Sequence, residues 1–142
     1  MITAVDSSVL LDVFGADLTF GAASREAVRR CRREGGLVAC EIVWAEVGAA
    51  FGSAADACDA MERLGVRFVP QNPDTAAGSG QLWRSYRRAG GSRQRVVPDF
   101  LIGVHAVAHA DRLLSRDRGF FRDYFADLVV LDPTPGPPAP RG

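Results

Sequence analysis

Short apolar runs alternate with segments of helical periodicity along almost the whole chain, and this alternation limits the fold more than any other feature. The runs typical of buried strands are residues 2–5, 37–40, 65–69, 111–115 and 128–131. Helical patterns cover residues 7–14, 20–34, 41–51, 54–64, 73–89, 98–110 and 117–125. Strands joined by helices form mostly parallel sheets. The sequence therefore predicts an α/β fold with a mostly parallel central sheet of four to five strands flanked by helices.

The length of the chain, 142 residues, suits one domain with one core. The last ten residues contain five of the eight prolines, a composition typical of an extended and poorly ordered segment. We therefore expect a single domain over residues 1–132 and a Pro-rich disordered tail over residues 133–142.

The chain contains 17 basic residues and 17 acidic residues, and all the basic ones are Arg. The absence of Lys excludes a Walker-type phosphate loop, a Schiff-base lysine and a Ser-Lys nucleophile pair. It also argues against a phosphoryl-receiver domain, in which we expect a Lys to contact the phosphoryl group.

Nothing in the sequence predicts export or a membrane span. The longest uncharged apolar stretch, residues 100–110, is shorter than the ~20 residues that a membrane helix needs. The N-terminal segment lacks basic residues and contains Asp6, unlike a secretory signal. The three cysteines have no CxxC spacing, which is typical of reduced thiols. We expect a cytoplasmic protein without a membrane partner.

Two carboxylates are expected at one edge of the predicted sheet, and a third is expected at the start of a helix. Asp6 ends the first apolar run, and Asp117 follows the run at 111–115. Because the carboxyl ends of parallel strands meet at the same edge, these two side chains belong to one region. Asp99 follows Pro98 in the first turn of a helix, where the helix dipole favours a negative charge.

A fourth carboxylate, Glu46, lies in the middle of a predicted helix among apolar residues. No basic residue occurs between Cys40 and Met61, so a buried Glu46 needs a partner from elsewhere in the chain. Glu41 lies about 140° around the same helix and is expected to be a helix N-terminal charge instead.

Four converging carboxylates repel one another, and a divalent cation relieves such repulsion. Oxygen ligands favour Mg²⁺ or Mn²⁺ over Zn²⁺. An ion of this kind activates water and stabilises a phosphoryl oxygen, which is the chemistry of phosphodiester hydrolysis. Each acid taken alone is also typical of ordinary capping, with Asp6 and Asp117 at strand ends and Asp99 at a helix N-terminus. That alternative stays open at this point.

Four segments together resemble the PIN-domain family. They are VDSSVLLDVF from Val5, WAEVGAAF from Trp44, VPDFLIGVHAVAHADRLLSRDRGFFRDYF from Val97, and LVVLDP from Leu128. Within that family the chain is most similar to VapC-type toxin ribonucleases of bacterial toxin–antitoxin pairs. The resemblance covers residues 2–132 and leaves only the Pro-rich tail outside it.

The resemblance implies a Mg²⁺- or Mn²⁺-dependent endoribonuclease. The acidic metal site of the family corresponds to Asp6, Glu46, Asp99 and Asp117. The small hydroxyl residue of the family corresponds to Ser115, where Thr is more common, and Ser7 is expected to help orient a ligand. The resemblance further implies a homodimer and a small antitoxin partner that occludes or disturbs the site.

A basic segment precedes Asp99, because residues 75–98 contain five Arg and no acidic residue. Arg pairs with phosphate and stacks on bases, so we expect RNA contacts from this segment. Its arginines are Arg84, Arg87, Arg88, Arg93 and Arg95. The aromatic Trp83 is expected to pack inward.

Two further arginines, Arg116 and Arg118, flank Asp117. The sequence leaves open whether they contact RNA or pair with an acid. Asp12 is expected to cap or pair nearby. The Arg run at residues 25–33 is diluted by acids at both ends and predicts a solvated helix face.

Three other functions stay open. One is a PIN-family RNA-processing nuclease that acts without an antitoxin. Another is a metal-dependent phosphatase, although the first strand is followed by DSSVL and not by the DxDxT pattern of such enzymes. The third is a binding module without catalytic activity.

Overall fold

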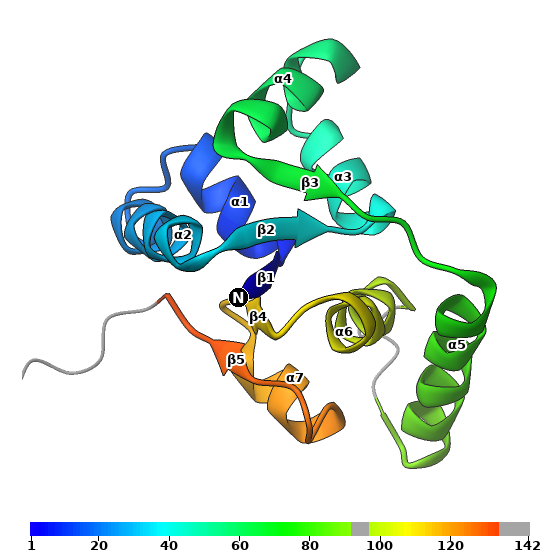
Figure 1. The fold of residues 1–142 in the computed structure, drawn as a ribbon. Coiled ribbons are helices and arrows are strands. Elements are labelled where there is room, and N and C mark those ends of the chain that lie inside the picture. The colour runs from blue at the N-terminus through cyan, green and yellow to red at the C-terminus, as the bar shows by residue number, and fades with distance from the viewer. Residues whose placement is uncertain (92–96, 134–142) are drawn as a thin grey trace, which may run out of the picture.

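The computed structural model describes residues 1–91 and 97–133, and five strands in these ranges form one sheet. The strands are β1 (Ile2–Val5), β2 (Gly36–Ala39), β3 (Val66–Phe68), β4 (Arg112–Leu114) and β5 (Val130–Leu131). Their order is β3-β2-β1-β4-β5, and every neighbouring pair is parallel (Figure 1). The predicted α/β fold is confirmed, with a sheet that is entirely parallel.

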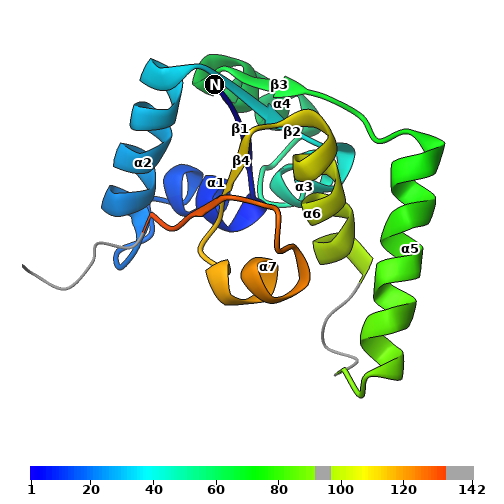
Figure 2. The same ribbon diagram turned by 60° about the horizontal axis from the view of Figure 1, so that its bottom comes forward.

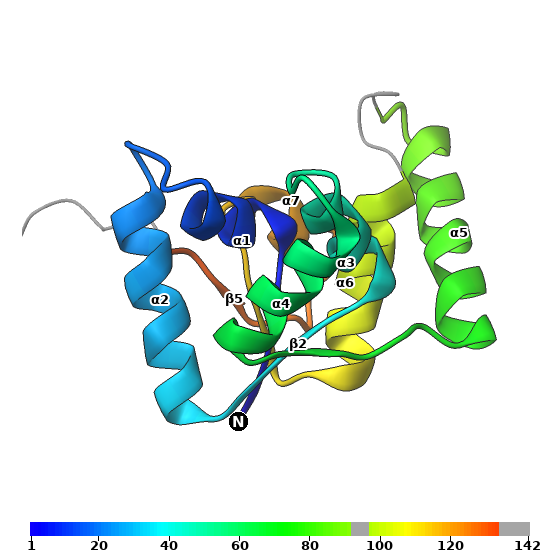
Figure 3. The same cartoon turned by 90° about the horizontal axis from the view of Figure 1, so that it is seen from above.

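Helices connect these strands and cover both faces of the sheet. They are α1 (Ser7–Phe14), α2 (Gly21–Glu34), α3 (Glu41–Gly48), α4 (Ala54–Leu64), α5 (Pro73–Arg88), α6 (Val97–His109) and α7 (Arg118–Tyr124). Helices α1 to α4 lie on one side of the sheet, and α6 and α7 lie on the other, with α5 packed outside α6 (Figures 2 and 3). The chain crosses the sheet in one direction from β1 to β3 and in the opposite direction from β3 to β5. Because crossovers between parallel strands are almost always right-handed, the helices of these two parts lie on opposite faces.

The three central strands β2, β1 and β4 are mostly apolar because helices bury them from both sides. Three residues of β2, Leu37 to Ala39, are buried, as are Leu113 and Leu114 of β4. Against the face that carries α6 and α7, the Phe100 ring packs edge-on against Phe120 with ring centres 5.2 Å apart. A stack of neighbouring aromatic rings therefore holds the two helices together.

One glycine of α6 is required by close packing. A Cβ at Gly103 would lie 2.3 Å from the ring of Phe125, which follows α7. Any side chain there would displace the aromatic ring, so the small residue allows α6 to lie close to the end of α7.

Most predicted boundaries agree with the structure to within one residue, but the strand predicted over residues 128–131 begins only at Val130. The helix predicted over residues 41–51 ends at Gly48. Asp6 occupies the N-cap position of α1, and Ser7 begins the helix. The Ser7 hydroxyl contacts carboxylates instead of backbone amides.

None of the helices in residues 1–91 and 97–133 combines the length and hydropathy that crossing a membrane requires. The predicted tail, residues 133–142, lies outside the described residues except for Pro133.

Candidate active site

The strand order reverses between β1 and β4, and the candidate site lies at the carboxyl ends of these two strands. From β1 the sheet continues to β2 and β3 on one side, and to β4 and β5 on the other. The Asp6 backbone N–H donates to the Leu114 carbonyl at 2.9 Å, which holds the two strand ends together. In open α/β sheets, ligands bind in the crevice outside such a reversal point.

Asp6 is the buried centre of this region, with 6% of its surface exposed. Its Oδ2 accepts hydrogen bonds from the Ser115 hydroxyl at 2.7 Å and the Ser8 hydroxyl at 3.1 Å. Burial raises the pKa of Asp6 above its ordinary value, and the negative charge of Asp117 raises it further. The hydroxyl donors lower this pKa but do not cancel the effect of burial.

Glu46 joins the site through Ser7, whose hydroxyl donates to Glu46 Oε2 at 3.2 Å. The buried environment predicted for Glu46 is wrong. Helix α3 buries Val43 and Val47, and Glu46 lies beside that buried face as an exposed residue. Its pKa is still raised, first by partial desolvation and then by the charges of Asp6 and Asp99.

The other two carboxylates occupy helix N-termini at the same edge. Asp99 lies in the first turn of α6, as predicted, and Asp117 directly precedes α7. The Asp117 backbone N–H donates to the Ser115 hydroxyl at 3.0 Å, so Ser115 links Asp117 to Asp6. The charge of Asp117 acts on Asp6, and the charges of Asp6 and Asp99 act on Glu46, so all four carboxylates that the sequence singled out lie in one region.

The chemistry of these donors fits a hard divalent cation. No group of three or more His, Cys, Asp or Glu side chains in the described ranges is arranged to hold a metal ion as it stands. The four groups are nevertheless all carboxylates. Burial raises the pKa of Asp6 and Glu46 and mutual repulsion raises it further, and a bound cation relieves repulsion of this kind. Asp6, Glu46, Asp99 and Asp117 are the residues that would hold it.

Arg116 forms an ion pair, which is one of the two roles left open for it. Its Nε and Nη2 donate to the two carboxylate oxygens of Asp12 at 2.7 and 3.1 Å. Its guanidinium also lies over the Phe20 ring, 4.1 Å from the ring centre. Arg118, on the other side of Asp117, is exposed at the start of α7.

Sequence reasoning missed Ser8 as a support of the site. The hydroxyl of Ser8 contacts Asp6 Oδ2 from the first turn of α1. The pair of serines after Asp6 could have predicted this contact. When a helix begins directly after a strand-end carboxylate, the side chain two positions further along can hydrogen-bond to that carboxylate.

The basic segment predicted to contact RNA is partly described. Arg84, Arg87 and Arg88 are exposed in the last part of α5, whereas Arg93 and Arg95 lie outside the described residues. Trp83 packs partly buried against the core, as expected, beneath the Arg87 guanidinium at 5.0 Å. The C-terminal end of α5 and the N-terminal end of α6 lie at the same end of the molecule (Figure 2).

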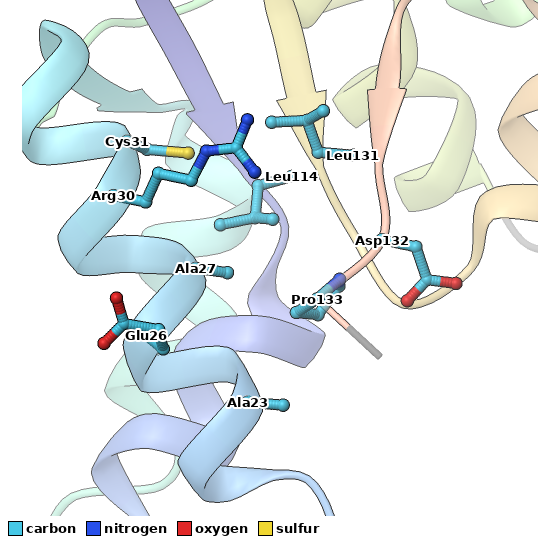
Figure 4. A pocket seen from close by; sticks show the side chains of 9 residues that line it. All are labelled: Ala23, Glu26, Ala27, Arg30, Cys31, Leu114, Leu131, Asp132 and Pro133. Atoms are coloured by element: carbon cyan, nitrogen blue, oxygen red, sulfur yellow. The ribbon is translucent and has the colours of Figure 1, made fainter. Parts of the chain in front are cut away.

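A separate pocket of about 320 Å³ lies between α2 and the ends of β4 and β5 (Figure 4). Its lining includes Ala27, Cys31 and Leu131, with the charged side chains of Arg30 and Asp132 at its edge (Figure 4). It contains none of the four carboxylates, so it does not belong to the candidate site.

The fold and the four carboxylates define a parallel α/β domain with an acidic site at its topological reversal point. The sequence model of the PIN domain matches residues 3–125, which is most of the chain. The chain belongs to the PIN-domain family. A comparison with curated proteins found no match.

Solved structures share this fold across nearly their whole length. A chain in the DNA-bound VapBC2 structure from Rickettsia felis has a TM-score of 0.71 and 14% identity, covering 93% of this chain and 98% of its own. A chain of VapBC-1 from nontypeable Haemophilus influenzae has a TM-score of 0.70 and 19% identity, covering 94% and 98%. VapC20 from Mycobacterium tuberculosis, a sarcin-ricin loop cleaving toxin, has a TM-score of 0.56 and 17% identity, covering 89% and 98%.

The contribution of Asp6 to the stability of the metal-free protein is expected to fall as the pH rises from about 4 towards neutrality. The pKa of Asp6 is raised in the folded state, so the folded protein binds more protons than the unfolded chain above the ordinary value of 3.8. The stability due to the protonated form is present below that value and is lost as the pH rises through the raised pKa. Asp6→Asn should therefore raise the thermal midpoint at neutral pH, and the gain should vanish in acid.

The measurement is thermal unfolding followed by circular dichroism in the presence of a chelator, between about pH 4 and pH 8. Asp123→Asn is the matched control, because Asp123 is an exposed carboxylate of α7. A lower midpoint for Asp6→Asn than for the wild type at neutral pH would contradict the prediction.

Proposed function

We propose that this protein is a divalent-metal-dependent endoribonuclease that hydrolyses RNA phosphodiester bonds and acts as the toxin of a type II toxin–antitoxin pair. The observation that carries the proposal is the convergence of four carboxylates around the buried Asp6 of a PIN domain. The structural neighbours support the toxin assignment, since they include VapBC complexes and an RNA-cleaving toxin.

The carboxylates Asp6, Glu46, Asp99 and Asp117 would bind Mg²⁺ or Mn²⁺. Such an ion, when bound, lowers the pKa of water and stabilises charge on a phosphoryl oxygen. Ser115 and Ser8 orient the Asp6 carboxylate by donating hydrogen bonds to one of its oxygens.

Glu46 is the carboxylate best suited to take a proton from the attacking water. It is the one of the four carboxylates that is exposed to solvent, so it is the one that an incoming water reaches most directly. Ser7 fixes its orientation through the hydrogen bond to Oε2.

RNA would lie between the acidic site and the end of α5. Three exposed arginines, Arg84, Arg87 and Arg88, supply positive charge at the same end of the molecule as the first turn of α6. Arginine pairs with phosphate through a planar fork and remains charged at all physiological pH values. Exposed Arg118 adds a further charge beside Asp117.

The partners we propose are a cognate antitoxin and a second copy of the chain, in the cytoplasm. The antitoxin is supported by the VapBC neighbours, whose structures are complexes. The cytoplasm is supported by the cysteines of the described part of the chain, Cys31, Cys40 and Cys58, which are unpaired and would remain reduced there.

Cleavage of a structured RNA should require added Mn²⁺ and should stop when a chelator is present. Asp99→Asn and Asp6→Asn should each lower the rate by at least about 100-fold, because each removes a charged donor from the metal site. Asp123→Asn, which changes an exposed carboxylate outside the site, should cleave at the wild-type rate. Activity that survives both site variants and the chelator would rule out the mechanism.

Expression of the chain in bacteria should arrest growth if the protein is a toxin. The arrest should be absent for Asp99→Asn, and co-expression of the gene next to it should relieve the arrest caused by the wild type. Purified protein that cleaves RNA but does not arrest growth would favour the RNA-processing nuclease without an antitoxin. Calorimetry that detects no divalent-ion binding would favour the binding module without activity.

Replacing Arg84, Arg87 and Arg88 together by Gln should weaken RNA binding and its dependence on salt. For single-stranded RNA, each arginine–phosphate pair that is removed lowers the slope of log K against log salt by about 0.7. The measurement is RNA binding by the wild type and the variant across a salt series in Ca²⁺, which is chosen to prevent cleavage.

The matched control replaces three exposed arginines of α2 by Gln, namely Arg29, Arg32 and Arg33. This control removes the same charge from a helix on the opposite side of the sheet. Equal losses of affinity for the two triple variants would show that RNA binding depends on total charge and not on α5.

A further inference from the structure

A second polar cluster lies directly behind the acidic site, on the side of α1 and α2. Its centre is Asp12, with 4% of its surface exposed. Arg116 donates to both carboxylate oxygens of Asp12, and the Ser24 hydroxyl of α2 donates to Asp12 Oδ2 at 2.9 Å. The cluster thus joins α1, α2 and the turn after β4 through one buried carboxylate.

The two residues beside Arg116 in this turn contact the acidic site. Ser115 donates to Asp6, and the Asp117 backbone N–H donates to Ser115. The Arg116 backbone N–H lies 3.5 Å from the Ser8 hydroxyl, which itself donates to Asp6. Three consecutive residues therefore connect the ion pair on one side with the acidic site on the other.

The geometry of the ion pair is rigid. A guanidinium that meets a carboxylate with two parallel N–H bonds has a fixed plane and a fixed direction, unlike a single point contact. The Phe20 ring covers the guanidinium at 4.1 Å, which limits its movement further. Removing either charge would leave the other one partly desolvated and without a partner, so breaking the ion pair is costly.

We propose that Arg116 is a positioning residue, whose ion pair with Asp12 fixes the turn that presents Ser115 and Asp117 to the metal site. The inference rests on the proposed function, because it concerns the metal site of that enzyme. The ion pair occupies the guanidinium, so Arg116 orients the donors and does not bind RNA phosphate.

The test is a calorimetric titration of the metal-free, full-length protein with Mn²⁺ alone. Outer contacts of metal sites typically contribute 10- to 100-fold in affinity, so Arg116→Gln and Asp12→Asn should each raise the Kd for Mn²⁺ by about 10-fold or more. Arg116→Lys keeps the charge but loses the fork and should give a smaller rise. In RNA cleavage, Arg116→Gln should lower kcat and leave the KM for RNA unchanged.

The control is Arg122→Gln, since Arg122 is an exposed residue of α7 whose partner is the exposed Asp123. It should bind Mn²⁺ like the wild type. Asp12→Asn separates the two roles of Arg116, because it releases the guanidinium without removing it. If Arg116 bound phosphate, Asp12→Asn would strengthen RNA binding and leave Mn²⁺ binding unchanged.

An unchanged Kd for Mn²⁺ in folded Arg116→Gln, or in folded Arg116→Lys should the Gln variant not fold, would overturn the proposal. Failure of all three variants to fold would also overturn it, because the pair would then serve the fold and not the site. A wild type that binds Mn²⁺ but cleaves no RNA would defeat the proposed function and leave the inference standing. A wild type that binds no Mn²⁺ would defeat both.

Discussion

The buried carboxylate of Asp6 is the group on which the arrangement of the site depends. Ser8 from α1 and Ser115 from the end of β4 both donate to it, and Ser7 links it to Glu46 on α3. Burial and repulsion raise its pKa in spite of these donors. The fold therefore holds a poorly solvated negative charge at the point where the strand order reverses.

Neutral and charged donors are used in different places. Serine hydroxyls hold Asp6 and Glu46, whereas arginines hold Asp12 and Glu34. A hydroxyl orients a carboxylate without cancelling its charge, so the site keeps its attraction for a cation. An arginine neutralises the acid it binds, which suits acids that do not themselves hold the cation. The net charge of zero consequently hides a separation of charge within the molecule.

The sequence was sufficient for the strands and for the places of Asp6, Asp99 and Asp117 in the fold. Strands buried on both faces are continuous apolar runs, strand ends locate Asp6 and Asp117, and the helix start after Pro98 locates Asp99. It was insufficient for the exposure of Glu46, since this depends on which face of α3 meets the core. The role of Arg116 also could not be predicted. Its pairing with Asp12 joins residues 104 positions apart and exists only after α1 and β4 have come together.

The strand order also sets the moment at which activity can arise during synthesis. β1 begins at the second residue, yet its partner at the site, β4, begins at Arg112. A ribosome has therefore made most of the domain before Asp6 can meet Ser115 and Asp117. A nascent chain that stops earlier lacks two of these three groups, so the acidic site is complete only once most of the domain has been made.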